Sequence, residues 1–324
     1  MMRLLRQHGW VVGLSALLMA LFVLTKLIQP SYGAGDFGSL VRAVLPYAFA
    51  VAAQTVVVIA GGIDLSVAAM MALTSVTAAA MMAGASEEYA LFVVPFVLAL
   101  GFTLGALNGI LIVVSRVPDI VVTLATLFML QGAALLVLPA PGGGAAEWLK
   151  NLIVGTVPIP ILPDDATDWF PKALLLLVVL LCAVWIPLKR SRLGLSIYAI
   201  GSSQLAAFRS GVPVARTKIL AYAIGGLFGA MGGLSLTMST GIGAPIPGPY
   251  LMASVAAVVL GGVVLGGGKG GLLGPIIAVF VLRLARTILT LLAIDPNVTA
   301  IVEGSILVAV VMFGAFIAMR SRSK

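Results

Sequence analysis

Long apolar runs recur along the whole chain and are separated by short polar stretches. About 20 consecutive apolar residues are enough for a helix to cross the hydrocarbon core of a membrane. By this measure the pattern predicts ten crossing segments, at about residues 10–28, 41–60, 65–84, 90–113, 119–138, 171–188, 218–240, 249–266, 271–294 and 297–319. The runs show no strand-like alternation, so we predict an all-α polytopic membrane protein.

Composition agrees with this pattern, because 61% of the 324 residues are hydrophobic and 9% are charged. The run from Trp10 to Ile28 is longer than the apolar region of a cleaved signal peptide, and no small-residue cleavage site follows it. We therefore expect a retained first helix and one transmembrane domain over residues 1–324.

The charged residues are divided unevenly between the two sides of this arrangement. With the N-terminus inside the cell, thirteen of the 19 Lys and Arg residues fall in cytoplasmic stretches and four fall outside, with Arg283 and Arg286 within a segment. Because cytoplasmic loops carry an excess of basic residues, ten segments with both termini cytoplasmic are predicted. The same bias explains the net charge of +8 without a nucleic-acid partner.

Two connections are long. The periplasmic loop at about 139–170 is rich in Pro, Gly and acidic residues, and we expect an ordered cap or a short interfacial helix there. The cytoplasmic loop at about 189–217 is amphipathic and too polar to span. A short helix is predicted over 202–210, because Ser202 or Ser203 can cap its start and Gly211 can end it.

Glycines recur at four-residue spacing in two segments, and such faces allow close helix packing. They are Gly101, Gly105 and Gly109 in one segment and Gly225, Gly229 and Gly233 in the other.

The sequence offers no residues for catalysis or for metal binding. One cysteine, Cys182, and one histidine, His8, make neither a disulfide within the chain nor a metal site. The run around Lys269 lacks the first glycine and the final Ser or Thr of a Walker A loop. We therefore expect no catalytic residue, no metal and no cofactor bound by this chain.

Polar residues inside the apolar segments are candidates for a solute path, although such residues commonly join neighbouring helices. Those chosen for the path are Gln54, Ser66, Asn108 and Gln131. No line of acidic or basic groups accompanies them, which favours a neutral polyhydroxy solute.

Ionisable residues within the segments need partners. Arg286 and Glu303 are predicted at similar depth on adjacent antiparallel helices, which favours a salt bridge over a proton relay. Asp64 follows Gly61 and Gly62 at a break between two segments, where it can cap the next helix near the cytoplasmic face. The alternative places this break deeper, where it would face a solute.

Three stretches, taken in order, resemble the permeases of ATP-binding-cassette sugar importers of the ribose, xylose and galactofuranose type. They are IAGGIDLSV (59–67), GLSIYAIGSSQLAAFRSGVPV (194–214) and AVVLGGVVLGGGKGGLLG (257–274). The resemblance covers about residues 40–311. Permeases for autoinducer sugars, nucleosides and branched-chain amino acids share parts of it.

The resemblance implies a multi-pass permease of the bacterial inner membrane that moves a monosaccharide inward and works with three kinds of partner. They are a second permease copy, identical or different, a cytoplasmic ATPase that binds ATP and Mg²⁺, and a periplasmic sugar-binding protein. The residues implied to dock on the ATPase, in a coupling helix, are Gln204, Ala206, Ala207, Arg209, Ser210 and Gly211. The alternatives are a permease for another small polar solute and an ion-coupled secondary transporter.

Overall fold

The computed structural model describes residues 2–158 and 163–295, together with positions 298, 301, 302, 304, 305, 308 and 312. Within this part of the chain every regular element is a helix, and β-pairing is limited to two isolated bridges. The prediction of an all-α protein is confirmed for these residues. The predicted last crossing segment, 297–319, lies almost wholly outside them.

Seven helices of the described chain are long and apolar enough to cross a membrane. They are α1 (Met2–Ile28), α2 (Ala34–Ile59), α4 (Ala90–Ser115), which follows the short 3₁₀ helix η1 (Glu87–Tyr89), α5 (Asp119–Val137), α8 (Lys172–Arg190), α11 (Val214–Thr240) and α13 (Leu273–Leu291). Each coincides with one of the apolar runs, because a run of that length can satisfy its backbone in hydrocarbon only as a helix.

Two helices are shorter than the runs that predicted them. α3 is Val67–Met82 and α12 is Tyr250–Leu260, whereas the runs predicted helices over 65–84 and 249–266. α12 ends early because Gly262 adopts the left-handed backbone conformation, with φ +83°. The next amides then bond back to the last helical turn, which is the glycine-terminated motif that stops helices even inside an apolar run.

The 189–217 connection contains two helices, α9 (Arg192–Ser202) and α10 (Gln204–Arg209). The predicted short helix is therefore present, but it begins two residues later and ends one residue earlier than predicted. The Ser203 hydroxyl accepts a hydrogen bond from the Ala206 amide at 3.3 Å, and Gly211, with φ +80°, ends the helix.

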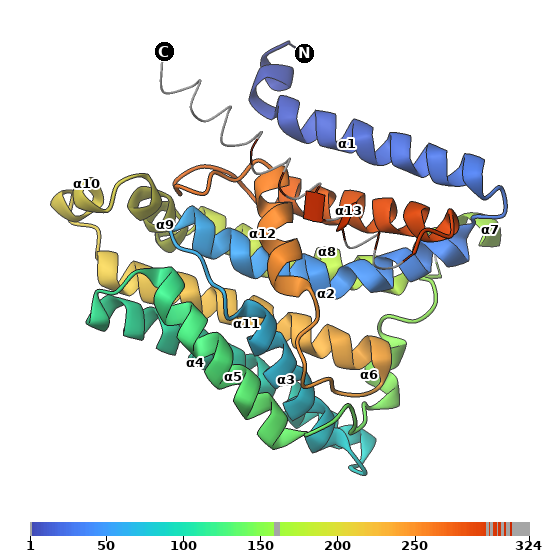
Figure 1. Cartoon of the computed structure of the whole chain (residues 1–324), viewed down its shortest axis with the longest axis horizontal. Coiled ribbons are helices and arrows are strands. Elements are labelled where there is room, and N and C mark those ends of the chain that lie inside the picture. Colours follow the sequence, from blue (N-terminus) through green and yellow to red (C-terminus); the bar gives the residue numbers. More distant parts are fainter. Residues whose placement is uncertain are drawn as a thin grey trace.

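The long connections gather at opposite ends of the helix bundle (Figure 1). α9 and α10 lie at one end, which we call the α10 end. The short helices α6 (Glu147–Asn151) and α7 (Asp164–Thr167) lie at the other, which we call the α6 end. The 139–170 loop, where an ordered cap or a short interfacial helix was expected, thus contains two short helices.

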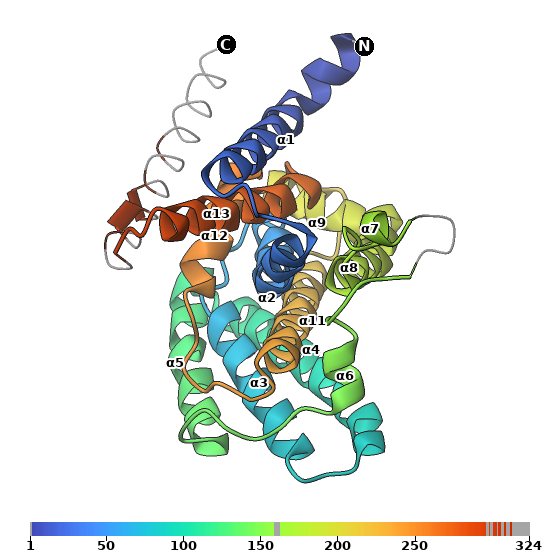
Figure 2. The same cartoon turned by 90° about the vertical axis from the view of Figure 1, so that its right-hand side faces the viewer.

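α2 is the central helix of the bundle (Figure 2). It contacts α3, α8, α9, α11, α12 and α13, and all of its residues from Val44 to Ile59 are buried. This stretch is apolar on every side except at Gln54 and Thr55. A helix without a polar face can be accommodated only where other helices surround it.

The two predicted glycine faces do pack closely, but not against each other. Gly101 and Gly105 of α4 lie against Gly226 of α11, and a Cβ at Gly226 would lie within 2.9 Å of the Gly105 Cα. The three glycines spaced along α11 face α2 and α3 instead, and they are Gly225, Gly229 and Gly233. α11 therefore packs through small residues on two sides, which explains why it is the most buried of the membrane-length helices after α2.

Gly226→Ala should force α4 and α11 apart. We expect it to lower the free energy of unfolding by about 1–3 kcal/mol, because the new methyl group meets backbone atoms that cannot move aside. The measurement is thermal unfolding of the purified protein in detergent. Gly132→Ala is the matched control, since nothing lies within 4 Å of its Cβ position in α5. Equal melting temperatures for the two variants would contradict the packing described here.

Candidate functional site

Three backbone segments touch at the α10 end through glycines, at what we call the glycine junction: Gly61, Gly201, Gly267 and Gly268. The Gly268 amide donates to the carbonyl of Ile59, the last residue of α2, at 2.9 Å. A Cβ at Gly267 would lie 2.8 Å from the Gly61 Cα and 2.9 Å from the Gly201 Cα. The end of α2, the end of α9 and the turn after α12 are therefore joined at van der Waals contact.

A tyrosine strengthens the connection between α9 and the same turn. The Tyr198 hydroxyl donates to the Gly270 carbonyl at 2.8 Å. Burial raises the pKa of Tyr198, so the hydroxyl keeps the proton that this bond requires. This bond links α9 directly to the turn that follows α12.

A buried ion pair lies just below this surface, between Asp119 at the start of α5 and Lys218 of α11. The Lys218 Nζ is 2.7 Å from Asp119 Oδ1, and the Tyr222 hydroxyl donates to Asp119 Oδ2 at 2.8 Å. The two charged side chains are only 13% and 14% exposed. A Cβ at Gly62 would lie 2.5 Å from both Asp119 Oδ2 and the Tyr222 hydroxyl, so the turn after α2 rests directly on this pair.

Asp64 lies in a second buried network. Its Oδ1 accepts from the Ser66 amide at 2.8 Å and from the Ser66 hydroxyl at 2.6 Å, and the Asn108 amide donates to the Ser66 hydroxyl at 2.8 Å. Ser66, not Asp64, is the N-cap residue of α3. Asp64 is fully buried, and its Oδ1 satisfies the Ser66 amide just before the helix, while its Oδ2 has no partner among the described residues.

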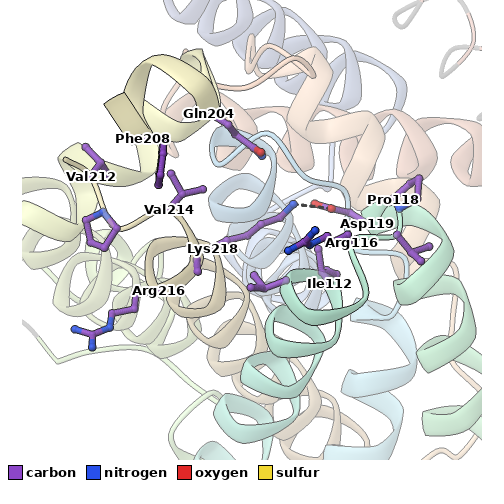
Figure 3. A pocket seen from close by; sticks show the side chains of 14 residues that line it. Ile112, Arg116, Pro118, Asp119, Gln204, Phe208, Val212, Val214, Arg216 and Lys218 are labelled. Atoms are coloured by element: carbon purple, nitrogen blue, oxygen red, sulfur yellow. Dashed lines mark hydrogen bonds and ion pairs between the residues drawn. The ribbon is translucent and has the colours of Figure 1, made fainter. Parts of the chain in front are cut away.

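An open groove of about 800 Å³ lies between α10, the connection from α4 to α5 and the start of α11. Gln204 and Phe208 of α10 form one wall, and Arg116 and the Lys218–Asp119 pair lie across from them (Figure 3). Within the part of the chain that the structure describes, Lys218 is the one basic residue of this groove with an ion-pair partner. The groove thus combines apolar walls with basic groups free to bind.

The residues proposed for docking are concentrated on the outer surface of α10. Five of the six are exposed, namely Gln204, Ala206, Arg209, Ser210 and Gly211. Ala207 is buried and attaches the helix to the bundle. Leu205 and Phe208 are also 61% and 69% exposed. Large apolar side chains on a short exposed helix are typical of a protein-binding surface.

Two of the four residues proposed for the solute path are in hydrogen-bond contact. Ser66 and Asn108 bond each other in the Asp64 network. Gln54 is fully buried in α2, and neither its amide oxygen nor its amide nitrogen has a partner among the described residues. Gln131 lies half-buried on α5. Ser66 and Asn108 are thus used for structure, while Gln54 remains unmatched.

Arg286 lies on α13, and its proposed partner Glu303 lies outside the described residues. That salt bridge stays a prediction.

Sequence reasoning missed Asp119, Lys218 and Tyr222. One signal for Asp119 was present, because it follows Pro118 at the beginning of an apolar run, which is where an acidic residue starts a helix. Nothing in the sequence pairs it with two residues about a hundred positions away.

A bundle of membrane-length helices, with an exposed short helix and a basic groove at one end, defines the chain as a polytopic membrane protein. The chain belongs to the family described as branched-chain amino acid transport system / permease component, which matches residues 37–311.

Several curated proteins are similar to the chain over nearly its whole length. The ribose import permease RbsC of Haemophilus influenzae is 28% identical over 91% of this chain and 90% of its own. RbsC of Escherichia coli is 28% identical over 93% and 92%. The autoinducer 2 import system permease LsrD of Escherichia coli is 28% identical over 94% and 92%. No solved structure matches the chain.

The Asp119–Lys218 pair should show strong energetic coupling. Lys218→Met or Asp119→Asn alone should cost about 1–3 kcal/mol of unfolding free energy, because each leaves a largely buried charge without its ion-pair partner. The double variant should be less destabilised than the sum of the two, by about 0.5–3 kcal/mol. The measurement is a double-mutant cycle by thermal unfolding.

Glu147→Gln is the control, because it breaks an exposed ion pair with Lys150, in which the carboxylate is 69% exposed. This variant should lower the free energy of unfolding by at most about 1 kcal/mol. Additive effects of the Asp119 and Lys218 variants would contradict the described pair.

Proposed function

We propose that this chain is the permease subunit of an ATP-binding-cassette importer that carries a monosaccharide into the cell across the bacterial inner membrane. Membership in a permease family and the functions of its relatives, ribose import and autoinducer 2 import, support this function. The observation that carries it in the structure is the exposed helix α10 beside a basic groove, joined through glycines to the central helix.

The topology belonging to this proposal is ten crossings with both termini in the cytoplasm. Seven of these crossings are the membrane-length helices. The other three would be α3, α12 and the segment beyond residue 296. The α10 end faces the cytoplasm, because basic residues gather in its connections. They are Arg116, Lys189, Arg190, Arg192, Arg209, Arg216 and Lys269.

The partner at the α10 end is a separate ATPase, which binds ATP and Mg²⁺ and hydrolyses the nucleotide. Phe208 and Leu205 supply the apolar part of the contact, and Arg209 and Arg116 supply its positive rim. A matching surface on the ATPase would be an apolar pocket with acidic residues at its edge. A second permease copy and a periplasmic sugar-binding protein complete the importer.

Movement of α10 reaches the membrane helices by two routes. The first runs through α9 to the glycine junction, where Gly201 lies against the end of α2 and the turn after α12. The second runs from α10 directly into α11, whose Lys218 holds Asp119 of α5. Because the contacts along both routes involve backbone atoms or a buried ion pair, displacement of α10 by the ATPase changes the packing of α2, α5, α11 and α12 together.

The chain itself performs no chemistry in this proposal. Among the described residues there is no cluster of three or more His, Cys, Asp or Glu side chains placed to hold a metal ion. The solute class is a neutral pentose or hexose, which needs hydrogen-bonding groups and aromatic faces rather than a charged pore.

Arg209→Glu should uncouple transport from ATP hydrolysis. It reverses a charge on the exposed face of α10, and we expect ATP-driven sugar uptake and co-purification of the ATPase to fall about tenfold or more, equivalent to about 1.4 kcal/mol of binding. Thermal stability should stay unchanged. The measurement is sugar uptake by vesicles that contain the complete importer.

Arg190→Glu makes the same charge change at the exposed end of α8, away from the groove, and should leave uptake within about twofold of the unaltered chain. If the two variants behave alike, α10 is not the docking helix.

A further inference from the structure

An arginine lies within a membrane-length helix without an acidic partner in the described structure. Arg283 stands near the middle of α13, and its guanidinium carbon lies 5.0 Å from the centre of the Tyr47 ring. Its Nε is buried and has no hydrogen-bond partner among the described residues, and none of them forms an ion pair with it. A charge at this depth is costly, and proteins retain it mainly where a pathway or binding site needs it.

A short helix, α12, begins beside this arginine. The Tyr47 ring lies 4.5 Å from the ring of Tyr250, the first residue of α12, and Tyr47 is near the middle of α2. α12 therefore starts midway along the bundle and, with 11 residues, is about 16 Å long. Figure 2 shows α12 beside both α2 and α13, which it also contacts.

Irregular backbone leads from the α6 end down to the start of α12. Gly243 pairs with Gly142 and packs against α3 one turn before that helix ends, whereas Tyr250 is already beside the middle of α2. Non-helical backbone at membrane depth is tolerated where protein buries it or where it lines a cavity. In transporters, half-length helices that begin near the midplane present their first turn to the solute.

Gln54 extends the same surface of α2. It is seven residues from Tyr47, which is two helical turns and the same face. Both polar atoms of its amide are buried without partners in the described structure. An unmatched buried amide costs about 1–3 kcal/mol, which a bound solute with hydroxyl groups can recover.

From these contacts we propose that Tyr47, Tyr250 and Arg283 form a binding station for a neutral sugar at the middle of the bundle, with Gln54 as the next contact toward the α10 end. The inference rests on the proposed function and adds the place where the sugar is held. An aromatic face covers the C–H side of a sugar ring, and the guanidinium fork donates to two neighbouring hydroxyls. The Gln54 amide both donates and accepts, as hydroxyl groups require.

The station and a purely structural role make different predictions. If the cluster only packs α2, α12 and α13 together, its removal lowers stability and transport of every sugar in parallel. If it holds the sugar, its removal changes which sugar is carried and how fast, at unchanged stability of the remaining complex.

The test uses the complete importer in proteoliposomes, with radiolabelled D-ribose, D-xylose, D-galactose and L-leucine as probes. Tyr47→Leu, Arg283→Lys and Gln54→Leu should each lower the uptake of the carried sugar about tenfold, or about 1.4 kcal/mol. They should also change the ratio between the best and second-best sugar about threefold or more, while ATPase activity without sugar and the melting temperature change little.

Phe49→Leu is the matched control, because it removes a fully buried aromatic ring from the same helix on a different face. It should leave the sugar ratio unchanged, whatever it does to stability.

The outcomes separate the station from the proposed function. One result is that the unaltered chain takes up sugar and all three variants keep the same sugar ratios. This result would overturn the station and leave the proposed function intact. ATP-driven uptake of L-leucine, with no uptake of the three sugars, would overturn both.

Discussion

The arrangement at the α10 end depends on the close approach of backbone segments that only glycine permits. Gly201 of α9 lies against the carbonyl of Ile59, and Gly267 and Gly268 fill the remaining space beside Gly61. A side chain at these positions would separate α2 from α9 and from the turn after α12. The same glycines form parts of three stretches that lie far apart in the sequence, so the segments that identify the family are also the segments that meet in space.

Buried polar groups in this protein fall into two sets with different uses. At the α10 end most are matched: Asp64 Oδ1 with Ser66, and Asp119 with Lys218 and Tyr222, while Asp64 Oδ2 has no partner among the described residues. In the middle of the bundle the amide of Gln54 and the Nε of Arg283 are unmatched within the described residues. Matched groups stabilise one arrangement of helices, whereas unmatched groups favour any solute that supplies the missing partners. In the proposed importer, the first set would serve coupling and the second the passage of sugar.

Much of the helix pattern could be predicted from the sequence, because apolar runs and helix-ending signals are local. Gly211 ended α10 as predicted, but Gly262 ended α12 inside an apolar run, where hydrophobicity alone predicted a longer helix. The site was predicted less completely. Ser66 and Asn108 were chosen for the path because they are polar, and only the fold shows that they bond each other. The contact between the rings of Tyr250 and Tyr47 joins residues about two hundred positions apart, and no local pattern indicates it.

The central claim is that ATP hydrolysed by a separate subunit drives a sugar through this chain. It is tested most directly by uptake of radiolabelled sugar into proteoliposomes that contain either the complete importer or this chain alone. The account predicts uptake only when the ATPase, ATP and the sugar-binding protein are all present, and none in response to a proton gradient. Uptake by the chain alone, driven by a proton gradient without ATP, would contradict it.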